Sequence, residues 1–180
     1  MEKLLKTFED LKQKNLSIDL TLLKPHSDQL DLSNDLMTQA VDPIGENGVD
    51  LRNYGEPIGI IEARRLGADI LDSKVDLTIA GEQSSYLLMT QLLLGRSLFG
   101  LDDDPWKDDK EPAFLCAVPG FDRHFATLEG LGLKMHTVNL CSSGIDLDDL
   151  NKKLSKYPNI KGLICVPRHS NPSGLSLIHI

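Results

Sequence analysis

The chain has 180 residues, of which 41% are hydrophobic and 26% are charged, a composition typical of a soluble globular domain. Its formal net charge of −8 argues against nonspecific binding to nucleic acid or to an anionic membrane surface. No apolar run approaches the ~18 residues of a membrane span, and the start, MEKLLKTFEDLKQK, lacks the apolar core of a secretory signal. We therefore expect a cytoplasmic protein.

Taken in chain order, residues 1–14 predict a short helix, and residues 15–50, rich in Pro, Gly, Asn and Asp, predict an irregular segment. Another helix follows, with an apolar face made by Ile60, Ala63, Leu66, Gly67 and Ile70. Residues 75–80 (VDLTIA) predict the first strand. The stretch YLLMTQLLLGRSLFG after it predicts a helix that is largely buried.

The second half continues the alternation of strand and helix. Residues 113–118 (AFLCAV), 133–140 (LKMHTVNL) and 160–167 (IKGLICVP) predict three further strands. A helix that opens at PGFDRH follows the first of them, and a helix capped by Asp146 follows the second. Because the strands are continuous apolar runs separated by helices, we expect an α/β fold with a mainly parallel sheet and flanking helices.

Three of these strands end in polar loops, which are residues 81–85 (GEQSS), 119–124 (PGFDRH) and 167–174 (PRHSNPSG). The carboxyl ends of parallel strands lie along one edge of the sheet, and ligands of open α/β sheets bind at that edge. We therefore expect the three loops to meet and to form a site.

The first loop leads into a helix N-terminus, whose N–H groups and dipole favour an anion. Gln83, Ser84 and Ser85 would add side-chain donors, although taken alone Ser84 is better interpreted as a helix N-cap. No Walker A, G-x-G-x-x-G or G-x-S-x-G pattern is present, so an ATP enzyme, a dinucleotide enzyme and a serine hydrolase lack support.

The other two loops are also ambiguous when each is taken alone. Phe121 is placed to stack on a planar ligand or to pack into the core. Arg123 and His124 face either the pocket or solvent. Pro172 favours an extended backbone at Asn171 and so fixes its amide, but NPSG also satisfies an ordinary turn.

The segments LRNYGEPIGIIEARRLGADIL, GEQSS, CAVPGFDRHFA, GLKMHTVNL and IKGLICVPRHSNPSG together resemble the pyridoxal-phosphate (PLP) aminotransferases of fold type I. The similarity is greatest to the bacterial aspartate aminotransferase subgroup and covers about residues 16–174. It implies an N-terminal arm and part of a small domain in residues 1–50, and the first half of a PLP-binding large domain in residues 51–174. It also implies transfer of an amino group between an amino acid, aspartate by expectation, and a 2-oxo acid.

The resemblance assigns a role to individual residues. Gln83 and Ser84, with the N–H groups around Ser85, would hold the cofactor phosphate. Phe121 would stack on the pyridine ring, and Asn171 would hydrogen-bond its phenolic oxygen and tune its electronics. Catalytic residues are not placed in this chain, since the lysine that anchors the cofactor lies beyond Asn171 in the family, and no metal is implied.

Tyr54 matches a tyrosine that reaches the phosphate in the neighbouring subunit, which implies a homodimer. The segment TLLKP (residues 21–25) departs from the Arg-Gly that the family usually has before its Lys-Pro, and this leaves the substrate open.

We expect the chain to be an inactive, truncated N-terminal fragment. The last six residues, LSLIHI (residues 175–180), resemble a translated sequencing adapter. Two alternatives remain: the aminotransferase-like sensor domain of a transcription regulator, and another fold type I PLP enzyme such as a lyase.

Overall fold

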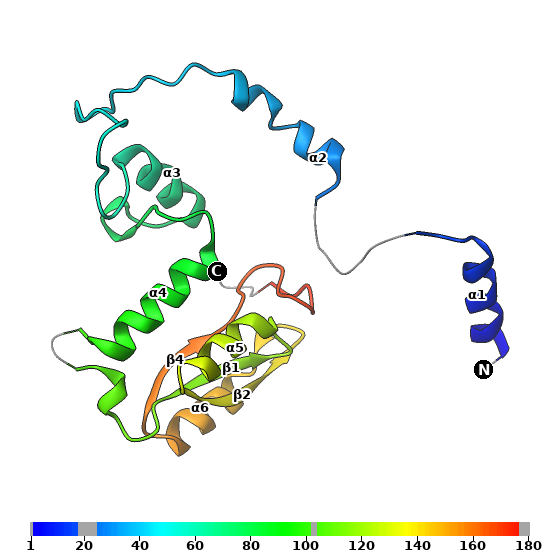
Figure 1. Cartoon of the computed structure of the whole chain (residues 1–180). Helices are drawn as coiled ribbons and strands as arrows, with labels where there is room; N and C mark the ends of the chain where they lie inside the picture. Colours follow the sequence, from blue (N-terminus) through cyan, green and yellow to red (C-terminus); the bar gives the residue numbers. More distant parts are fainter. Residues whose placement is uncertain (1, 18–24, 102–103, 177–180) are drawn as a thin grey trace. The chain divides into compact units, whose positions relative to one another are not determined.

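The computed structural model describes residues 2–17, 25–101 and 104–176 (Figure 1). The chain divides into two units, Met1–Gly55 and Glu56–Ile180. Residues 21–24 of the TLLKP segment and residues 177–180 lie outside the described part.

The first unit is an arm of short elements. It contains α1 (Glu2–Gln13), α2 (Ser27–Asp31) and the 3-10 helix η1 (Asn34–Thr38). None of its described residues is buried. The predicted first helix is confirmed, and the described part of residues 15–50 holds only the two five-residue helices α2 and η1.

The second unit is built on a four-stranded sheet with the order β3-β2-β1-β4. β1 (Ala113–Val118) pairs in parallel with both β2 (Lys134–Cys141) and β4 (Ile160–Ile164). The two-residue β3 (Gly144–Ile145) runs antiparallel to β2. The sheet is therefore mixed but mainly parallel, as the sequence predicts.

Two helices connect the parallel strands. α5 (Asp122–Gly130) leads from β1 to β2, and α6 (Leu147–Lys156) leads from β2 back past β1 to β4 (Figure 1). Since the two crossovers run in opposite directions, right-handed connections place these helices on opposite faces of the sheet. The Asp146 side chain accepts hydrogen bonds from the Asp148 and Asp149 N–H groups, so the predicted cap of α6 is confirmed.

β1 is buried on both faces, and on one of them residues of β1, α5 and the segment before β1 pack into a cluster. Phe114 and Cys116 of β1 are 4% and 2% exposed, and Leu128 of α5 is fully buried. Trp106, in the 3-10 helix η3 (Trp106–Asp108), packs its ring edge-on against Phe114 with the centroids 5.5 Å apart. Leu93 of α4 (Ser85–Leu98) also belongs to this cluster, which ties α4 to the sheet.

The prediction of a strand at residues 75–80 is wrong. Val75–Leu77 form the 3-10 helix η2, and Thr78 continues in an extended conformation without a neighbouring strand among the described residues. Arg64, buried in α3 (Ile61–Leu71), donates hydrogen bonds from Nε to the Thr78 carbonyl (2.9 Å) and from Nη2 to the Val75 carbonyl (2.8 Å). The guanidinium thus occupies carbonyl oxygens that would otherwise accept hydrogen bonds from a neighbouring strand.

The prediction that α4 is largely buried is also wrong. Leu93 and Ser97 are its only buried residues, whereas Leu92 and Leu98 are 67% and 42% exposed. Phe99, just after the helix, is 75% exposed. Only one stripe of α4 faces the core. Apolar side chains occur on the other faces of the helix as well, and the described residues leave these exposed.

Candidate functional site

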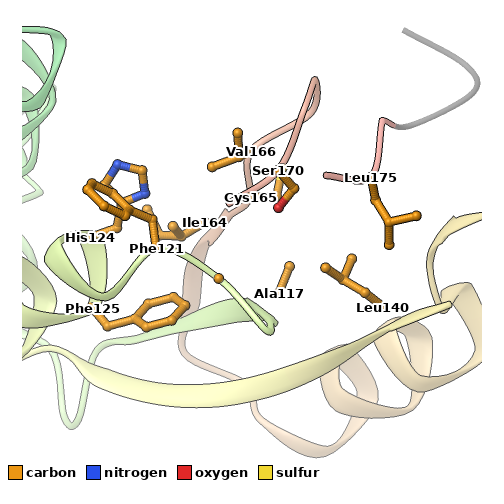
Figure 2. Close-up of a pocket in the computed structure, with 11 residues that line it drawn as sticks. Ala117, Phe121, His124, Phe125, Leu140, Ile164, Cys165, Val166, Ser170 and Leu175 are labelled. Atoms are coloured by element: carbon orange, nitrogen blue, oxygen red, sulfur yellow. The ribbon is translucent and has the colours of Figure 1, made fainter. Parts of the chain in front are cut away.

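A small pocket lies at the carboxyl edge of the sheet, between the ends of β1 and β4 (Figure 2). The strand order reverses at this point, because the chain runs from β1 to β2 on one side and then crosses to β4 on the other side of β1. Such a reversal opens a crevice at the carboxyl edge of α/β sheets. The pocket is lined by strand residues Ala117, Leu140 and Ile164, by Cys165 and Val166 after β4, and by side chains of the two following loops.

Phe121 occupies the N-cap position of α5 and lines the pocket. Its ring meets the His124 ring edge-on, with the centroids 5.1 Å apart, and the Arg123 guanidinium lies over it at 5.9 Å. Phe121 is half-buried rather than packed into the core cluster. Of the two interpretations that the sequence leaves open, the structure therefore places this ring at the pocket.

His124 also lines the pocket, which the sequence leaves undecided (Figure 2). It follows Phe121 by three residues, so one turn of helix brings both side chains to the same face. Burial lowers the pKa of His124 below its ordinary value of 6.5, because desolvation disfavours the charged imidazolium. Burial therefore favours the neutral form of the imidazole at the pocket wall.

The loop after β4 closes the other side of the pocket. Ser170 is 5% exposed and lines the pocket, and Asn171 beside it is half-buried but does not line it. The Ser170 N–H donates to the Leu175 carbonyl (2.7 Å), and the Gly174 N–H donates to the Ser170 carbonyl (2.5 Å). This turn brings Leu175 against the pocket, where the remaining free volume is about 10 Å³, room for one water at most.

The residues expected to bind a phosphate lie at the N-terminus of α4 and do not line this pocket. The Ser84 hydroxyl accepts a hydrogen bond from the Leu87 N–H (3.3 Å), so its predicted role as N-cap is confirmed. A hydroxyl that accepts in this way still has its own hydrogen to donate. Gln83 and Ser85 are exposed, and the first N–H groups of a helix have no carbonyl partner within the helix.

A hydrogen bond between two helices connects the α4 N-terminus to the pocket. The Tyr86 hydroxyl and the Thr127 hydroxyl lie 2.6 Å apart, and Thr127 also donates to the Arg123 carbonyl (3.0 Å). Tyr86 is two residues after Ser84, and Arg123 is two residues after Phe121. The loops before α4 and α5 are therefore held near one another, whereas the loop after β4 joins Phe121 directly at the pocket.

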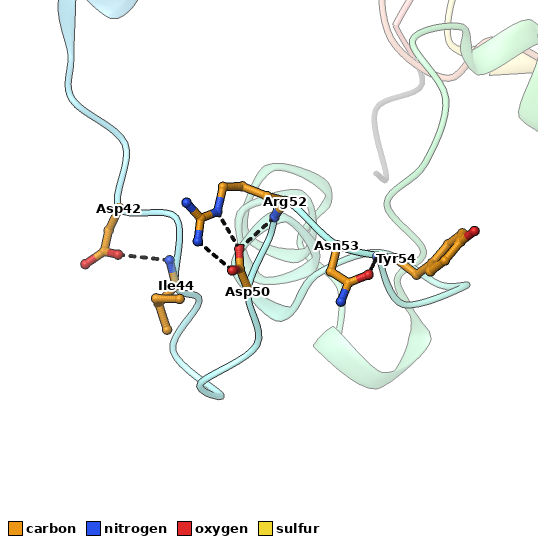
Figure 3. Close-up of polar contacts among 6 residues, drawn as sticks. All are labelled: Asp42, Ile44, Asp50, Arg52, Asn53 and Tyr54. Carbon is orange, nitrogen blue, oxygen red and sulfur yellow. Dashed lines mark hydrogen bonds and ion pairs between the residues drawn. The ribbon is translucent and has the colours of Figure 1, made fainter.

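Tyr54 lies in the first unit, next to a polar turn (Figure 3). Asp50 accepts two hydrogen bonds from the Arg52 guanidinium, at 2.8 Å and 2.6 Å, which lowers the pKa of Asp50 and raises that of Arg52. Tyr54 itself is 98% exposed, and its N–H donates to the Asn53 side chain (2.8 Å).

The donors present in the second unit fit a planar ring that carries a phosphate group. An exposed helix N-terminus with hydroxyl and amide side chains suits a phosphate, and an aromatic wall suits a ring. Within the described residues no group of three His, Cys, Asp or Glu side chains could hold a metal ion. No lysine of the described ranges lines the pocket, and no described helix is long and apolar enough to cross a membrane.

Two comparisons with known sequences both point to aspartate aminotransferases. The profile of the family described as aspartate amino-transferase matches residues 1–179. An aspartate aminotransferase of Corynebacterium glutamicum is 37% identical over 182 aligned positions, which cover 98% of this chain and 41% of the relative.

Solved structures give the same result. An aspartate transaminase of C. glutamicum superposes with a TM-score of 0.85 at 37% identity, covering 99% of this chain and 43% of the other. LysN, an α-aminoadipate aminotransferase of Thermus thermophilus solved with N-(5′-phosphopyridoxyl)-L-leucine, shares the fold at 20% identity, with a TM-score of 0.53 and coverage of 70% and 29%.

The chain spans about two fifths of the length of its aspartate aminotransferase relatives. The family profile nevertheless matches nearly every residue, and the α/β unit has the fold type I architecture that the comparisons share. The chain belongs to the aspartate aminotransferase family.

Proposed function

We propose that this chain supplies the phosphate-binding and ring-stacking half of a PLP site in an aminotransferase. The observation that carries the proposal is the pocket between β1 and β4, where Phe121 and the loop of Asn171 meet at the carboxyl edge of the sheet. The family membership of the chain and the phosphopyridoxyl ligand of the related LysN structure support this choice of cofactor.

The N-terminus of α4 would bind the phosphate. The helix dipole and the first N–H groups favour an anion there, and Gln83, Ser84 and Ser85 add side-chain donors. The Ser84 hydroxyl would serve two roles at once, because it accepts from the Leu87 N–H while its own hydrogen remains available to the phosphate.

The pocket would bind the ring. Phe121 would stack on one face of the pyridine, with its own orientation held by the flanking Arg123 and His124 side chains. Asn171 would donate a hydrogen bond to the phenolic oxygen. When bound, PLP would supply an electron sink for the α-carbon of an amino acid. Leu175 would have to move, since the free volume of about 10 Å³ is too small for a ring.

The proposed reaction moves an amino group from an amino acid, aspartate by analogy with the named relatives, to a 2-oxo acid. In a homodimer, Tyr54 would reach the phosphate held by the neighbouring subunit. The high exposure of Tyr54 leaves its hydroxyl accessible for such a contact.

The test is a titration of the purified 180-residue chain with PLP, followed by the change in cofactor absorbance. We expect saturable binding that Phe121→Ala weakens by about threefold to tenfold, the value of one aromatic stacking contact. Phe8→Ala is the matched control, because Phe8 is 59% exposed on α1 in the other unit.

Equal affinity for the Phe121→Ala and Phe8→Ala variants would contradict the placement of the ring. A second readout is borohydride reduction followed by peptide mapping. Because the lining residues that the structure describes include no lysine, we expect no adduct concentrated at one lysine.

A further inference from the structure

A second cleft lies at the opposite, amino-terminal edge of the sheet and has a volume of about 450 Å³. That volume is within the range of small-molecule sites. Its polar lining comes from the loop before β1, the start of β2 and the connection from α6 to β4. These residues are Lys110, Glu111, Lys134, His136, Tyr157 and Asn159. None of them belongs to the PLP site proposed above.

Hydrogen bonds between its walls fix the shape of this cleft. The Ala113 N–H donates to the Asn159 carbonyl (3.0 Å), and the Lys134 N–H donates to the Pro112 carbonyl (2.9 Å). The Asn159 side-chain amide donates to the Lys110 carbonyl (2.6 Å). Because these groups satisfy one another, the groups left to meet a ligand are side chains.

A stack of two rings forms one wall. The His136 and Tyr157 rings are parallel within 5°, with the centroids 3.5 Å apart. The Lys156 ammonium lies 5.0 Å from the Tyr157 ring centroid. This arrangement holds the imidazole in place and adds a cation next to the cleft.

Positive charge gathers here although the chain as a whole carries a net charge of −8. Among the described residues, neither the Lys110 nor the Lys134 ammonium has an ion-pair partner, and Glu111 is the only carboxylate in the lining. The pKa of His136 is lowered by burial and by the charges of Lys153 and Lys156, with Glu111 acting in the opposite direction. The cleft is therefore cationic, which favours an anion.

We propose that this cleft binds a small phosphate monoester, with the ammonium groups of Lys110 and Lys134 on the phosphate and the His136–Tyr157 wall against the rest of the molecule. Two ammonium groups outweigh the single carboxylate of Glu111 in the described lining and attract a phosphate dianion. The volume of about 450 Å³ exceeds that of a phosphate ion and leaves room for an organic group.

The experiment is isothermal titration calorimetry of the 180-residue chain with ribose 5-phosphate. Parallel titrations use ribose, inorganic phosphate and succinate. We expect saturable binding of ribose 5-phosphate, weaker binding of inorganic phosphate and succinate, and no binding of ribose. The double variant Lys110→Ala/Lys134→Ala should weaken binding by about tenfold or more, because two charge-assisted contacts are lost.

Lys152→Ala is the matched control, since it removes one exposed lysine of α6 outside the cleft lining. If the control loses as much affinity for ribose 5-phosphate as the double variant, the overall charge of the chain explains the effect, and the proposal is overturned. Absence of saturable binding in the millimolar range, or equal affinity for succinate, would also overturn it.

A second measurement uses the wild-type chain alone. A dianion bound beside His136 should raise the pKa of its imidazole, followed by NMR with and without ribose 5-phosphate. An unchanged pKa under saturating ligand would place the ligand elsewhere and contradict the proposal.

Discussion

Phe121 and His124 show how one turn of helix prepares two different side chains for a pocket. Phe121 precedes α5 and presents its ring, while His124 packs edge-on against that ring from within the helix. The motif PGFDRH allows Phe121 to be identified from the sequence, because an aromatic residue directly after a strand stands at the sheet edge. The direction in which the His124 side chain points could not be predicted. It depends on where α5 begins and on which residues pack against this helix.

The pKa of His124 gives a pH prediction with a definite sign. Burial lowers it below 6.5 in the folded chain, while the unfolded chain takes up the proton near 6.5. The contribution of neutral His124 to stability is therefore fully present above about pH 6.5 and is lost as the pH falls through the folded pKa.

His124→Gln should therefore reduce the loss of unfolding free energy between about pH 7 and about pH 5, measured by urea denaturation. Asn151→Gln, at an exposed position of α6, carries no titratable group; it is the control and should leave the slope as in the wild type. A steeper slope for His124→Gln would contradict the sign.

The three free cysteines should react with thiol reagents at very different rates. Burial raises the pKa of Cys116 to about 11 and also raises that of Cys165. Cys141 is exposed, and a contact with the Ser143 hydroxyl (3.2 Å) lowers its pKa. Because the thiolate is the reactive form, Cys141 should be modified first by Ellman's reagent.

The expected result is one fast thiol, which Cys141→Ser removes and Ser143→Ala slows. Ser142→Ala is the matched control, because Ser142 is exposed and is the immediate neighbour. A fast phase that survives Cys141→Ser would show that a buried thiol is accessible.

At the scale of elements, the N-terminus of α4 combines a structural role with a proposed binding role. Replacing Ser84 by Ala removes the acceptor for the Leu87 N–H and should lower the unfolding free energy by about 1 kcal/mol. Ser85→Ala is the matched control, since Ser85 follows directly and is exposed. Equal effects of the two substitutions in urea denaturation would argue against the cap.

The packing of β4 against β1 depends on a glycine. A Cβ built on Gly162 would lie 2.6 Å from Cε1 of Phe114, whose ring is 4% exposed and packs against Trp106. Gly162→Ala should therefore destabilise the unit by roughly 1–3 kcal/mol, the usual cost of overpacking. Gly130→Ala, where a Cβ would meet nothing within 4 Å, should be neutral or slightly stabilising in the same thermal melts.

The elements that depend on local sequence could be predicted, and those that depend on distant partners could not. α6 with its Asp146 cap and the apolar run of β1 follow from short-range patterns. Residues 75–80 have the composition of a strand, but Arg64 bonds their carbonyls and no described strand pairs with them. The exposure of Leu92 on α4 is likewise set by what packs against the helix.

At the scale of the whole second unit, the strand order decides where a ligand can bind. The sequence predicts parallel strands with polar loops at one edge, but the order β2-β1-β4, and hence the crevice between β1 and β4, comes only from the structure. Two of the three expected loops meet there, and the third is held nearby through Tyr86 and Thr127.

The two proposed sites lie at opposite edges of the sheet and share no lining residue. The PLP site uses the carboxyl ends of the strands, and the phosphate-ester cleft uses their amino ends. PLP is itself a phosphate monoester, so PLP titrations of Phe121→Ala and of Lys110→Ala/Lys134→Ala, compared side by side, separate binding at the two sites.

Hydrogen–deuterium exchange of the chain with and without PLP, read by mass spectrometry, tests the central claim most directly. The account predicts slower exchange in peptides that cover residues 81–90, 119–125 and 165–174, which contain the α4 N-terminus, Phe121 and Asn171. Unchanged exchange in all three segments at saturating PLP, or protection confined to residues 110–113, 134–136 and 157–159, would contradict it.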